Sequence, residues 1–199
     1  VTSGLKRHNI VHMAKRQATS RIIAGSYKGT KLSFKPNKNL RPTESKTKET
    51  LFNWLLNDLH KKKCLDMFAG TGALGLEALS RGADEVVFFE KQKALCGAIE
   101  VVVKKLGINN KCRVINANST AFDFTTLNTK FDLIFLDPPF HESLIQKSLN
   151  IISENQLLTE QGLVYIECER DLDLGSLKTN LTQLKLSKGG ETKYCLYES

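Results

Sequence analysis

The sequence predicts an α/β fold in which helices cover both faces of a doubly wound, mostly parallel sheet. Three observations support this prediction. From residue 63 onward, short apolar runs alternate with helical stretches; a glycine-rich turn joins the first run to the first helix; and the last two runs are spaced as a hairpin. Repeated strand–helix units give parallel strands, and the closing hairpin adds antiparallel strands at one edge. The 199 residues suffice for one full core.

The expected elements follow one another without repeats or long linkers. Before the sheet we expect a short hairpin at 21–34, a loop at 40–43 and an amphipathic helix at 45–59. The strands of the sheet are expected at 64–68, 86–90, 114–115, 131–136 and 163–167. The helices between them are expected at 73–80, 92–106 and 142–153, and the terminal hairpin at 181–187 with 193–198.

Charge divides the chain into three expected regions: a flexible basic arm at 1–20, a hairpin and helix extension at 21–60, and a main domain at 61–199. Residues 1–63 contain 15 Lys or Arg against three acidic residues, a net charge of +12, whereas the whole chain carries +8. Concentrated positive charge is the electrostatic footprint of a nucleic-acid-binding surface. A solvated, solubilising face explains the charge alone equally well.

Composition excludes several other classes of protein. No apolar stretch approaches the roughly 18 residues that a membrane span requires. The five cysteines are odd in number and widely spaced, and no pair forms a CxxC motif. This pattern indicates reduced, mostly buried thiols in a cytoplasmic protein, with neither a disulfide framework nor a metal site. Nothing indicates an obligate dimer, so we expect a monomer.

The tetrapeptide Asp137-Pro138-Pro139-Phe140 is the most informative motif of the chain. It follows the apolar run 131–136, and ligands of open α/β sheets bind beyond the carboxyl ends of such strands. The two prolines fix their own φ angles and favour extended conformations before them. The motif is suited to holding a flat ring that carries an exocyclic amine. Alternatively, it is only a rigid strand exit with a buried phenylalanine.

A second motif lies where the first strand turns into the first helix. Gly70, Gly72 and Gly75 satisfy GxGxxG, in which glycines allow tight turns and close approach of a nucleotide. Asp66, just before this loop, would repel a pyrophosphate but suits the ammonium group of a methionine-bearing cofactor. Glu90 ends the second strand and can accept hydrogen bonds from both ribose hydroxyls.

Each of these acids has a simpler explanation, because Asp66 could cap a helix and Glu90 could be an exposed charge. Glu90 is compatible with NAD or S-adenosylmethionine, whereas Asp66 favours the latter. Asn118 and Ser119 follow the third strand, where Asn118 could offer its amide to adenine, with Phe68 or Phe122 as an apolar neighbour. Capping of a helix explains Asn118 and Ser119 equally well.

Together these residues resemble the Rossmann-like class of S-adenosylmethionine-dependent methyltransferases. From about Arg21 to the C-terminus, the chain is similar to the RsmD family of bacterial enzymes, which methylate the exocyclic N2 of a guanine in 16S ribosomal RNA. The family usually has a second glycine at Ala24, and arginine at Lys46 and Lys48. The resemblance rests on residues 21–25 with 28–29, 41–43, 49–55, 66–75 and 137–140.

The resemblance implies a role for each matching residue. Asp66, Phe68, Gly70, Gly72, Glu90, Asn118 and Ser119 would bind the cofactor, and no metal would be needed. Asp137 and Pro138 would receive the target amine, and Phe140 would pack against the guanine. Arg21, Lys28, Arg41 and Thr43 would face the RNA or the mouth of the active site. The expected partner is 16S ribosomal RNA or the small ribosomal subunit, and no membrane.

Three other functions fit part of the sequence. A DNA adenine-N6 methyltransferase also needs a site for an exocyclic amine, but the chain lacks a sizeable target-recognition domain. An NAD-dependent oxidoreductase fits GxGxxG and Glu90 yet leaves Asp66 and Asp137 without roles. A noncatalytic RNA-binding module would use only the basic N-terminal segment.

Overall fold

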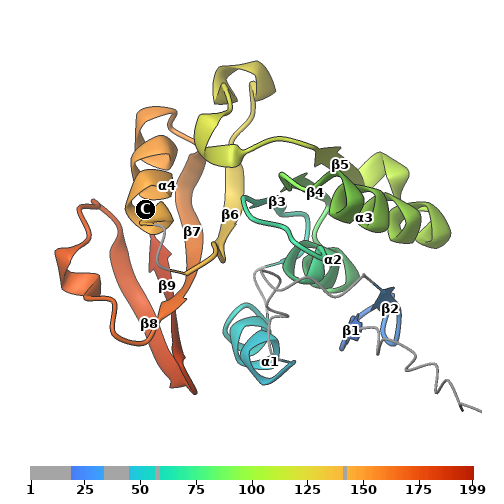
Figure 1. The fold of residues 1–199 in the computed structure, drawn as a ribbon, viewed down its shortest axis with the longest axis horizontal. Helices are drawn as coiled ribbons and strands as arrows, with labels where there is room; N and C mark the ends of the chain where they lie inside the picture. The colour runs from blue at the N-terminus through green and yellow to red at the C-terminus, as the bar shows by residue number, and fades with distance from the viewer. Residues whose placement is uncertain (1–18, 34–44, 57–58, 141–142) are drawn as a thin grey trace, which may run out of the picture.

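The computed structural model describes residues 19–33, 45–56, 59–140 and 143–199 (Figure 1). The predicted loop at 40–43 and most of the predicted arm at 1–20 lie outside these residues. A two-stranded hairpin consists of β1 (Thr19–Arg21) and β2 (Lys31–Ser33). The central sheet contains β3 (Lys63–Asp66), β4 (Glu85–Phe89), β5 (Cys112–Ile115), β6 (Phe131–Leu136), β7 (Leu158–Glu169), β8 (Thr182–Gly189) and β9 (Thr192–Glu198).

The seven strands of this sheet lie in the order β5-β4-β3-β6-β7-β9-β8. The five strands from β5 to β7 pair in parallel, and β9 pairs antiparallel with both β7 and β8. The predicted fold class is therefore confirmed. The direction of winding reverses between β3 and β6, which is the switch point where doubly wound sheets bind ligands. The two signature motifs follow these two strands.

Alternate residues of the strands point into two separate apolar cores. Cys64 of β3 and Phe88 of β4 face the side covered by α1 (Ser45–Trp54), α2 (Ala73–Ser80) and α3 (Lys93–Leu106). Leu65 and Phe89 face the opposite side, which is covered by α4 (Leu144–Glu154) and the short 3-10 turns. This period of two is the geometry of a strand buried on both faces.

Most predicted bounds shift by one to a few residues, and two elements differ most from their predicted lengths. The helix expected at 45–59 ends at Trp54. The prediction was too long because Leu55 and Leu59, which are buried in the core, were counted as helix residues. The strand expected at 163–167 extends over Leu158–Glu169, with a shift in register opposite Phe131 and Leu133. The spacing of apolar residues indicates which residues are buried and not where an element ends. It therefore made the predicted helix too long, and it missed the polar residues at the start of the strand.

The N-terminal extension packs on the same side of the sheet as α2 (Figure 1). Ile22, Leu32, Leu51 and Phe52 are each at most 2% exposed and join the core that covers that side. The predicted hairpin is present, although its strands are joined by a long connection at 22–30. None of the described helices is long and apolar enough to cross a membrane.

Candidate active site

One cavity of about 460 Å³ lies at the carboxyl ends of β3, β4, β5 and β6. Residues that follow each of the four strands line it, so the two signature loops open onto a common space. Nine of the residues that the sequence singles out line the cavity: Asp66, Phe68, Gly70, Glu90, Asn118, Ser119, Asp137, Pro138 and Phe140.

Asp66 is the most deeply buried charged side chain of the cavity wall, at 1% exposure. Its Oδ2 accepts a long hydrogen bond from the Gly75 amide, at 3.3 Å. Its Oδ1 has no hydrogen-bond partner among the described residues. Burial raises the pKa of Asp66 to about 7; the Gly75 and Phe68 amides oppose this effect in part, and the nearby Asp137 and Glu90 carboxylates add to it. A cation in the cavity would therefore stabilise its ionised form.

The three glycines of the loop have separate tasks. Gly70 lines the cavity in a left-handed conformation, with φ of 53°, and its amide donates to Glu90. Gly72 is left-handed too, at 75°, but it is buried before α2 and does not line the cavity. A Cβ at Gly75 would overlap the Phe88 ring, so this glycine allows α2 to pack against β4. Only Gly70 is thus positioned to meet a ligand.

Glu90 connects the loops after β3 and β4. Its Oε2 accepts from the Gly70 amide at 2.9 Å, and its Oε1 accepts from the Gln92 amide at 2.7 Å. A carboxylate has about four lone-pair positions, so these two bonds leave it capacity for two more donors. Orientation by two backbone amides holds the side chain at the cavity wall.

Asn118 caps a 3-10 turn that begins at Ser119. Its Oδ1 accepts hydrogen bonds from the amide and the hydroxyl of Thr120, both at 3.1 Å. Capping thus uses the carbonyl oxygen and not the Nδ2 group, which is a donor. Ser119 is 2% exposed, and its hydroxyl has no hydrogen-bond partner in the part of the chain that the structure describes. Phe122 packs against Phe89 and does not line the cavity.

The tetrapeptide after β6 lines the same cavity. Pro138 is buried, whereas Asp137 and Phe140 are partly exposed to the cavity. Tyr165 lies behind it on β7, where its hydroxyl donates to Glu167 at 3.0 Å. Burial, with additional effects of the Glu167 and Asp137 carboxylates, raises the pKa of Tyr165 well above its ordinary value. Tyr165 therefore stays protonated as a donor beside the tetrapeptide.

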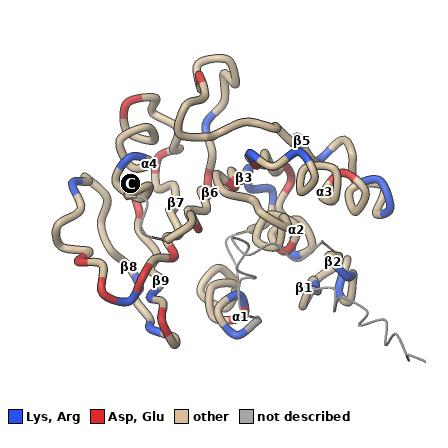
Figure 2. The backbone as a smooth tube through the Cα atoms, in the orientation of Figure 1, with Lys and Arg blue, Asp and Glu red and all other residues tan. Residues whose placement is uncertain are grey.

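The residues expected to meet RNA lie elsewhere. Arg21 and Lys28 are exposed on the hairpin and its connection, and neither lines the cavity. Arg41 and Thr43 lie outside the described residues. Figure 2 marks the positions of basic residues along β2 and α1. Lys31 of β2 and Lys46 of α1 are both exposed.

Sequence reasoning did not single out several further residues of the cavity wall. Lys91 and Gln92 directly follow Glu90, Thr120 follows Ser119, and Leu144 begins α4. Each stands just after a motif residue, or at the start of a helix that follows a strand. Position after the strand ends was the signal that could have found them.

The fold and the cavity define a Rossmann-like protein of the methyltransferase class. The solved structure of yhhF from Escherichia coli matches with a TM-score of 0.79 and 33% identity, over 91% of this chain and 98% of that one. In fold alone, the chain is also similar to a Thermus thermophilus 16S rRNA N2 G1207 methyltransferase solved with AdoMet and guanosine. That match has a TM-score of 0.67 and 21% identity, and covers 92% of this chain and 50% of that one.

The particular family follows from the sequence comparisons. The family described as "Conserved hypothetical protein 95" matches residues 20–198, and the chain belongs to it. The ribosomal RNA small subunit methyltransferase D of Haemophilus influenzae is 41% identical over 181 residues, which cover 90% of this chain and 93% of that protein. Its Escherichia coli K12 counterpart is 36% identical over 178 residues, 89% of each chain.

Proposed function

We propose that this protein transfers a methyl group from S-adenosylmethionine to the exocyclic N2 amine of a guanine in 16S ribosomal RNA. The substrate class comes from its relatives, which are named as methyltransferases of small-subunit ribosomal RNA. The single observation that carries the chemistry is the shared cavity, which both the glycine loop and the Asp137 tetrapeptide line. The proposed substrate implies action in the bacterial cytoplasm.

The polar atoms of the cavity fit the proposed cofactor. Asp66 Oδ1 is a buried acceptor without a partner among the described residues, and it suits the ammonium group of the methionine part. Glu90 has two remaining acceptor positions for the two ribose hydroxyls. Asn118 Nδ2 and the Ser119 hydroxyl can bond the nitrogens of adenine, while Phe68 supplies an apolar surface.

When bound, the cofactor supplies a methyl group on a positively charged sulfur, which is already activated for transfer. The task of the protein is therefore to prepare the acceptor. The lone pair of a guanine N2 amine is delocalised into the ring, which makes the amine a poor nucleophile. Hydrogen bonds from its two protons to Asp137 and to the Pro138 carbonyl would favour a more tetrahedral nitrogen. They would also direct its lone pair at the methyl carbon.

Transfer breaks one carbon–sulfur bond and forms one carbon–nitrogen bond. The amine then loses one proton, which Asp137 can accept as a general base. Positioning of the reactants can contribute up to roughly 7–11 kcal/mol in ideal cases. Phe140 lines the same cavity as Asp137 and offers a ring on which the guanine can stack.

A guanine within a duplex cannot reach this cavity. The target must be unpaired or flipped out of its stack, which costs a few kcal/mol in a duplex and less in an irregular loop. Exposed Arg21, Lys28 and Lys31 on the hairpin provide positive charge for the surrounding backbone.

The test compares methyl transfer to four substrates: small ribosomal subunits, bare 16S RNA, duplex DNA and free guanosine. The subunits are isolated from cells that lack this protein, and mass spectrometry then locates the methyl group. We expect N2-methylguanine at one position of the RNA. Transfer to adenine in the DNA duplex would overturn the proposal in favour of the DNA methyltransferase, and a site on another guanine atom would overturn the proposed acceptor chemistry.

A further inference from the structure

We propose that Glu77 is a positioning residue for RNA: its buried carboxylate holds both parts of the N-terminal extension against α2. The inference rests on the proposed function, because it assigns the hairpin to the RNA substrate. Glu77 lies in the second half of α2, while the first turn of the same helix follows the glycine loop of the cavity. One short helix would thus serve the cofactor site at one end and the RNA-binding extension at the other.

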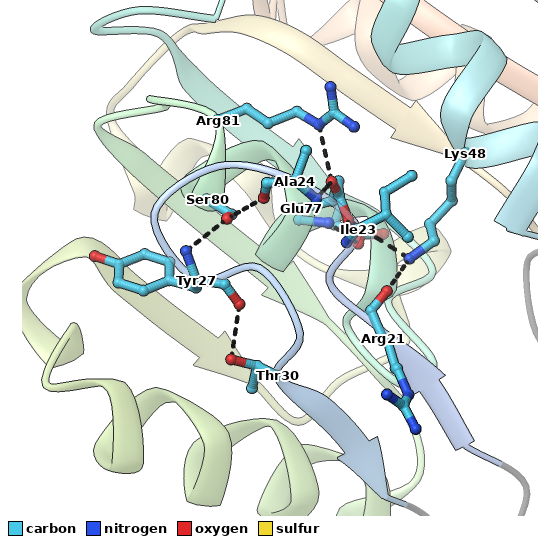
Figure 3. Close-up of polar contacts among 11 residues, drawn as sticks. Arg21, Ile23, Ala24, Tyr27, Thr30, Lys48, Glu77, Ser80 and Arg81 are labelled. Atoms are coloured by element: carbon cyan, nitrogen blue, oxygen red, sulfur yellow. Dashed lines mark hydrogen bonds and ion pairs between the residues drawn. The ribbon is translucent and has the colours of Figure 1, made fainter.

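The carboxylate of Glu77 is fully buried and meets donors from three segments (Figure 3). The amides of Ile23 and Ala24 donate to it at 2.8 and 3.0 Å. Arg81, the C-cap residue of α2, donates to it through Nε at 2.8 Å, and Lys48 Nζ of α1 lies 3.6 Å away. We call these five residues the Glu77 cluster.

The two amides show why a carboxylate is needed here. Ile23 and Ala24 lie in the connection at 22–30, beyond the paired residues of β1 and β2. Glu77 therefore takes the place of a partner strand for this part of the hairpin. A charged acceptor makes stronger hydrogen bonds than a neutral one, and two donors converge on its two oxygens.

Lys48 extends the same cluster to α1. Its side chain is fully buried, and its Nζ donates to the backbone carbonyl of Arg21 at 2.6 Å while it pairs with Glu77. Burial lowers the pKa of Lys48, and the adjacent Glu77 opposes that effect. Lys48 thus joins the last residue of β1 to α1 and is not available to RNA. Loss of its partner would leave an uncompensated buried charge.

Ser80 completes the contact one turn further along α2. Its carbonyl accepts from the Ser26 amide at 2.7 Å, and its hydroxyl accepts from the Tyr27 amide at 2.9 Å. Arg21 and Lys28 flank this docked segment in sequence, and both side chains are exposed. The backbone of residues 23–27 is therefore bonded to α2, and the flanking basic side chains of Arg21 and Lys28 face solvent.

The backbone and the side chains of this segment thus have separate functions. The backbone docks the extension against the main domain, and the exposed side chains of Arg21 and Lys28 are left for phosphate contacts. If Glu77 sets their position, its loss weakens recognition of the large RNA and leaves the cofactor cavity intact. If Glu77 only stabilises α2, its loss affects the glycine loop and therefore cofactor binding as well.

The variant Glu77→Gln distinguishes these outcomes, because it keeps the shape of the side chain and removes its charge. We expect the KM for small ribosomal subunits to rise about tenfold, with kcat and the Kd for S-adenosylmethionine within about twofold of wild type. Hydrogen exchange should become faster in residues 19–33 and stay unchanged in 63–140. Glu85→Gln is the matched control, because Glu85 forms a partly exposed pair with Lys63 at 3.6 Å and should leave all four quantities unchanged.

Lys48→Met tests the same contact should Glu77→Gln not fold. Lys48→Met retains the apolar stem and removes the charge, and it should raise the KM for RNA with little effect on cofactor Kd. The positioning role would be overturned by an unchanged KM for RNA in a folded variant. It would also be overturned if the cofactor affinity fell by the same factor as the KM rose, or if neither variant folded. A wild-type protein that fails to methylate small-subunit RNA would instead refute the proposed function, whatever the variants do.

Discussion

Two buried carboxylates of this molecule, Asp66 and Glu77, meet opposite surroundings. Both are at most 1% exposed, and they lie on either side of the glycine loop and the first turn of α2. Glu77 receives two backbone amides, one guanidinium and one ammonium group. Asp66 accepts a long hydrogen bond from the Gly75 amide, and its Oδ1 has no partner within hydrogen-bond geometry in the described part of the chain.

The difference indicates which carboxylate serves a ligand. Burial of an ionised group without hydrogen-bond donors is costly, so folded proteins normally supply donors to such groups. A buried carboxylate that lacks donors therefore indicates a functional role. At Glu77 the chain supplies every donor itself, and the result is docking of the extension. At Asp66 the donors are incomplete beside a cavity, and a ligand can complete them. Replacement of Glu77 should disturb docking of the extension and leave cofactor binding unchanged, whereas replacement of Asp66 should disturb cofactor binding.

The largest effect is expected at Asp137, in the region that faces the ligand. Asp137→Ala removes both the acceptor for the amine and the general base, and should lower kcat about 10³-fold. Cofactor Kd and melting temperature should stay close to wild type, because the backbone of the tetrapeptide remains fixed by its prolines. Single-turnover methyl transfer and calorimetry would measure these quantities.

Asp137→Asn is the matched control for this prediction. It keeps one oxygen that can accept from the amine and loses the basic carboxylate. Intermediate activity would assign part of the effect to positioning, and activity as low as that of Asp137→Ala would assign it to proton acceptance. Loss of cofactor binding in either variant would contradict the separation between acceptor and cofactor residues.

The second prediction concerns Asp66 and makes the comparison with Glu77 direct. Asp66→Asn removes the charge that would pair with the ammonium of the cofactor, and should weaken the Kd about 10–100-fold. Without cofactor and above pH 7, the same variant should be more stable than wild type, because an underpaired buried charge is gone. Titration calorimetry and thermal melts check the two parts. A variant that binds as well as wild type would remove Asp66 from the cofactor site.

The pH dependence of stability follows from the same residue. The pKa of Asp66 is about 7 in the fold, above its ordinary 3.8, so the folded state binds the proton more tightly than the unfolded state. The free energy of unfolding of the cofactor-free protein should therefore fall as the pH rises from about 4 to about 7, by at most about 4 kcal/mol from this group. Asp66→Asn should lack this component, which melts at pH 5 and pH 8 can measure.

Two glycines in the connection at 22–30 allow an equally specific test of its contact with α2. Gly25 and Gly29 both have positive φ angles, 80° and 86°. A Cβ at Gly25 would overlap the Ser80 carbonyl, whereas a Cβ at Gly29 would meet nothing within 4 Å. Gly25→Ala should therefore cost about 1–3 kcal/mol more in unfolding free energy than Gly29→Ala, which carries only the backbone strain. Equal losses would show that contact with α2 is not tight at Gly25.

The sequence predicted the sheet, the two signature loops and their common edge, because strand period and glycine position are local properties. It did not predict the Glu77 cluster, because the partners of Glu77 lie up to 54 residues away. Lys48 illustrates the limit: in sequence it is one more lysine in a basic segment, and in the fold it is fully buried. The sequence also did not distinguish Gly70, which lines the cavity, from Gly72, which precedes α2. The spacing of glycines is the same whether an amide faces a ligand or begins a helix.

The smallest effect is expected where the docked segment presents its charge to solvent. Lys28→Ala removes one exposed cation and no described hydrogen bond of its side chain, so melting temperature and cofactor Kd should not change. If Lys28 contacts one phosphate, RNA affinity should fall a few-fold, and the slope of log K against log salt should become shallower by about one unit. Lys104→Ala on α3, also exposed, is the control and should leave the slope unchanged. A Lys28 effect that is independent of salt would mean that this residue acts through the packing of the connection, and the basic side chains of the docked segment would then have no demonstrated contact with the RNA backbone.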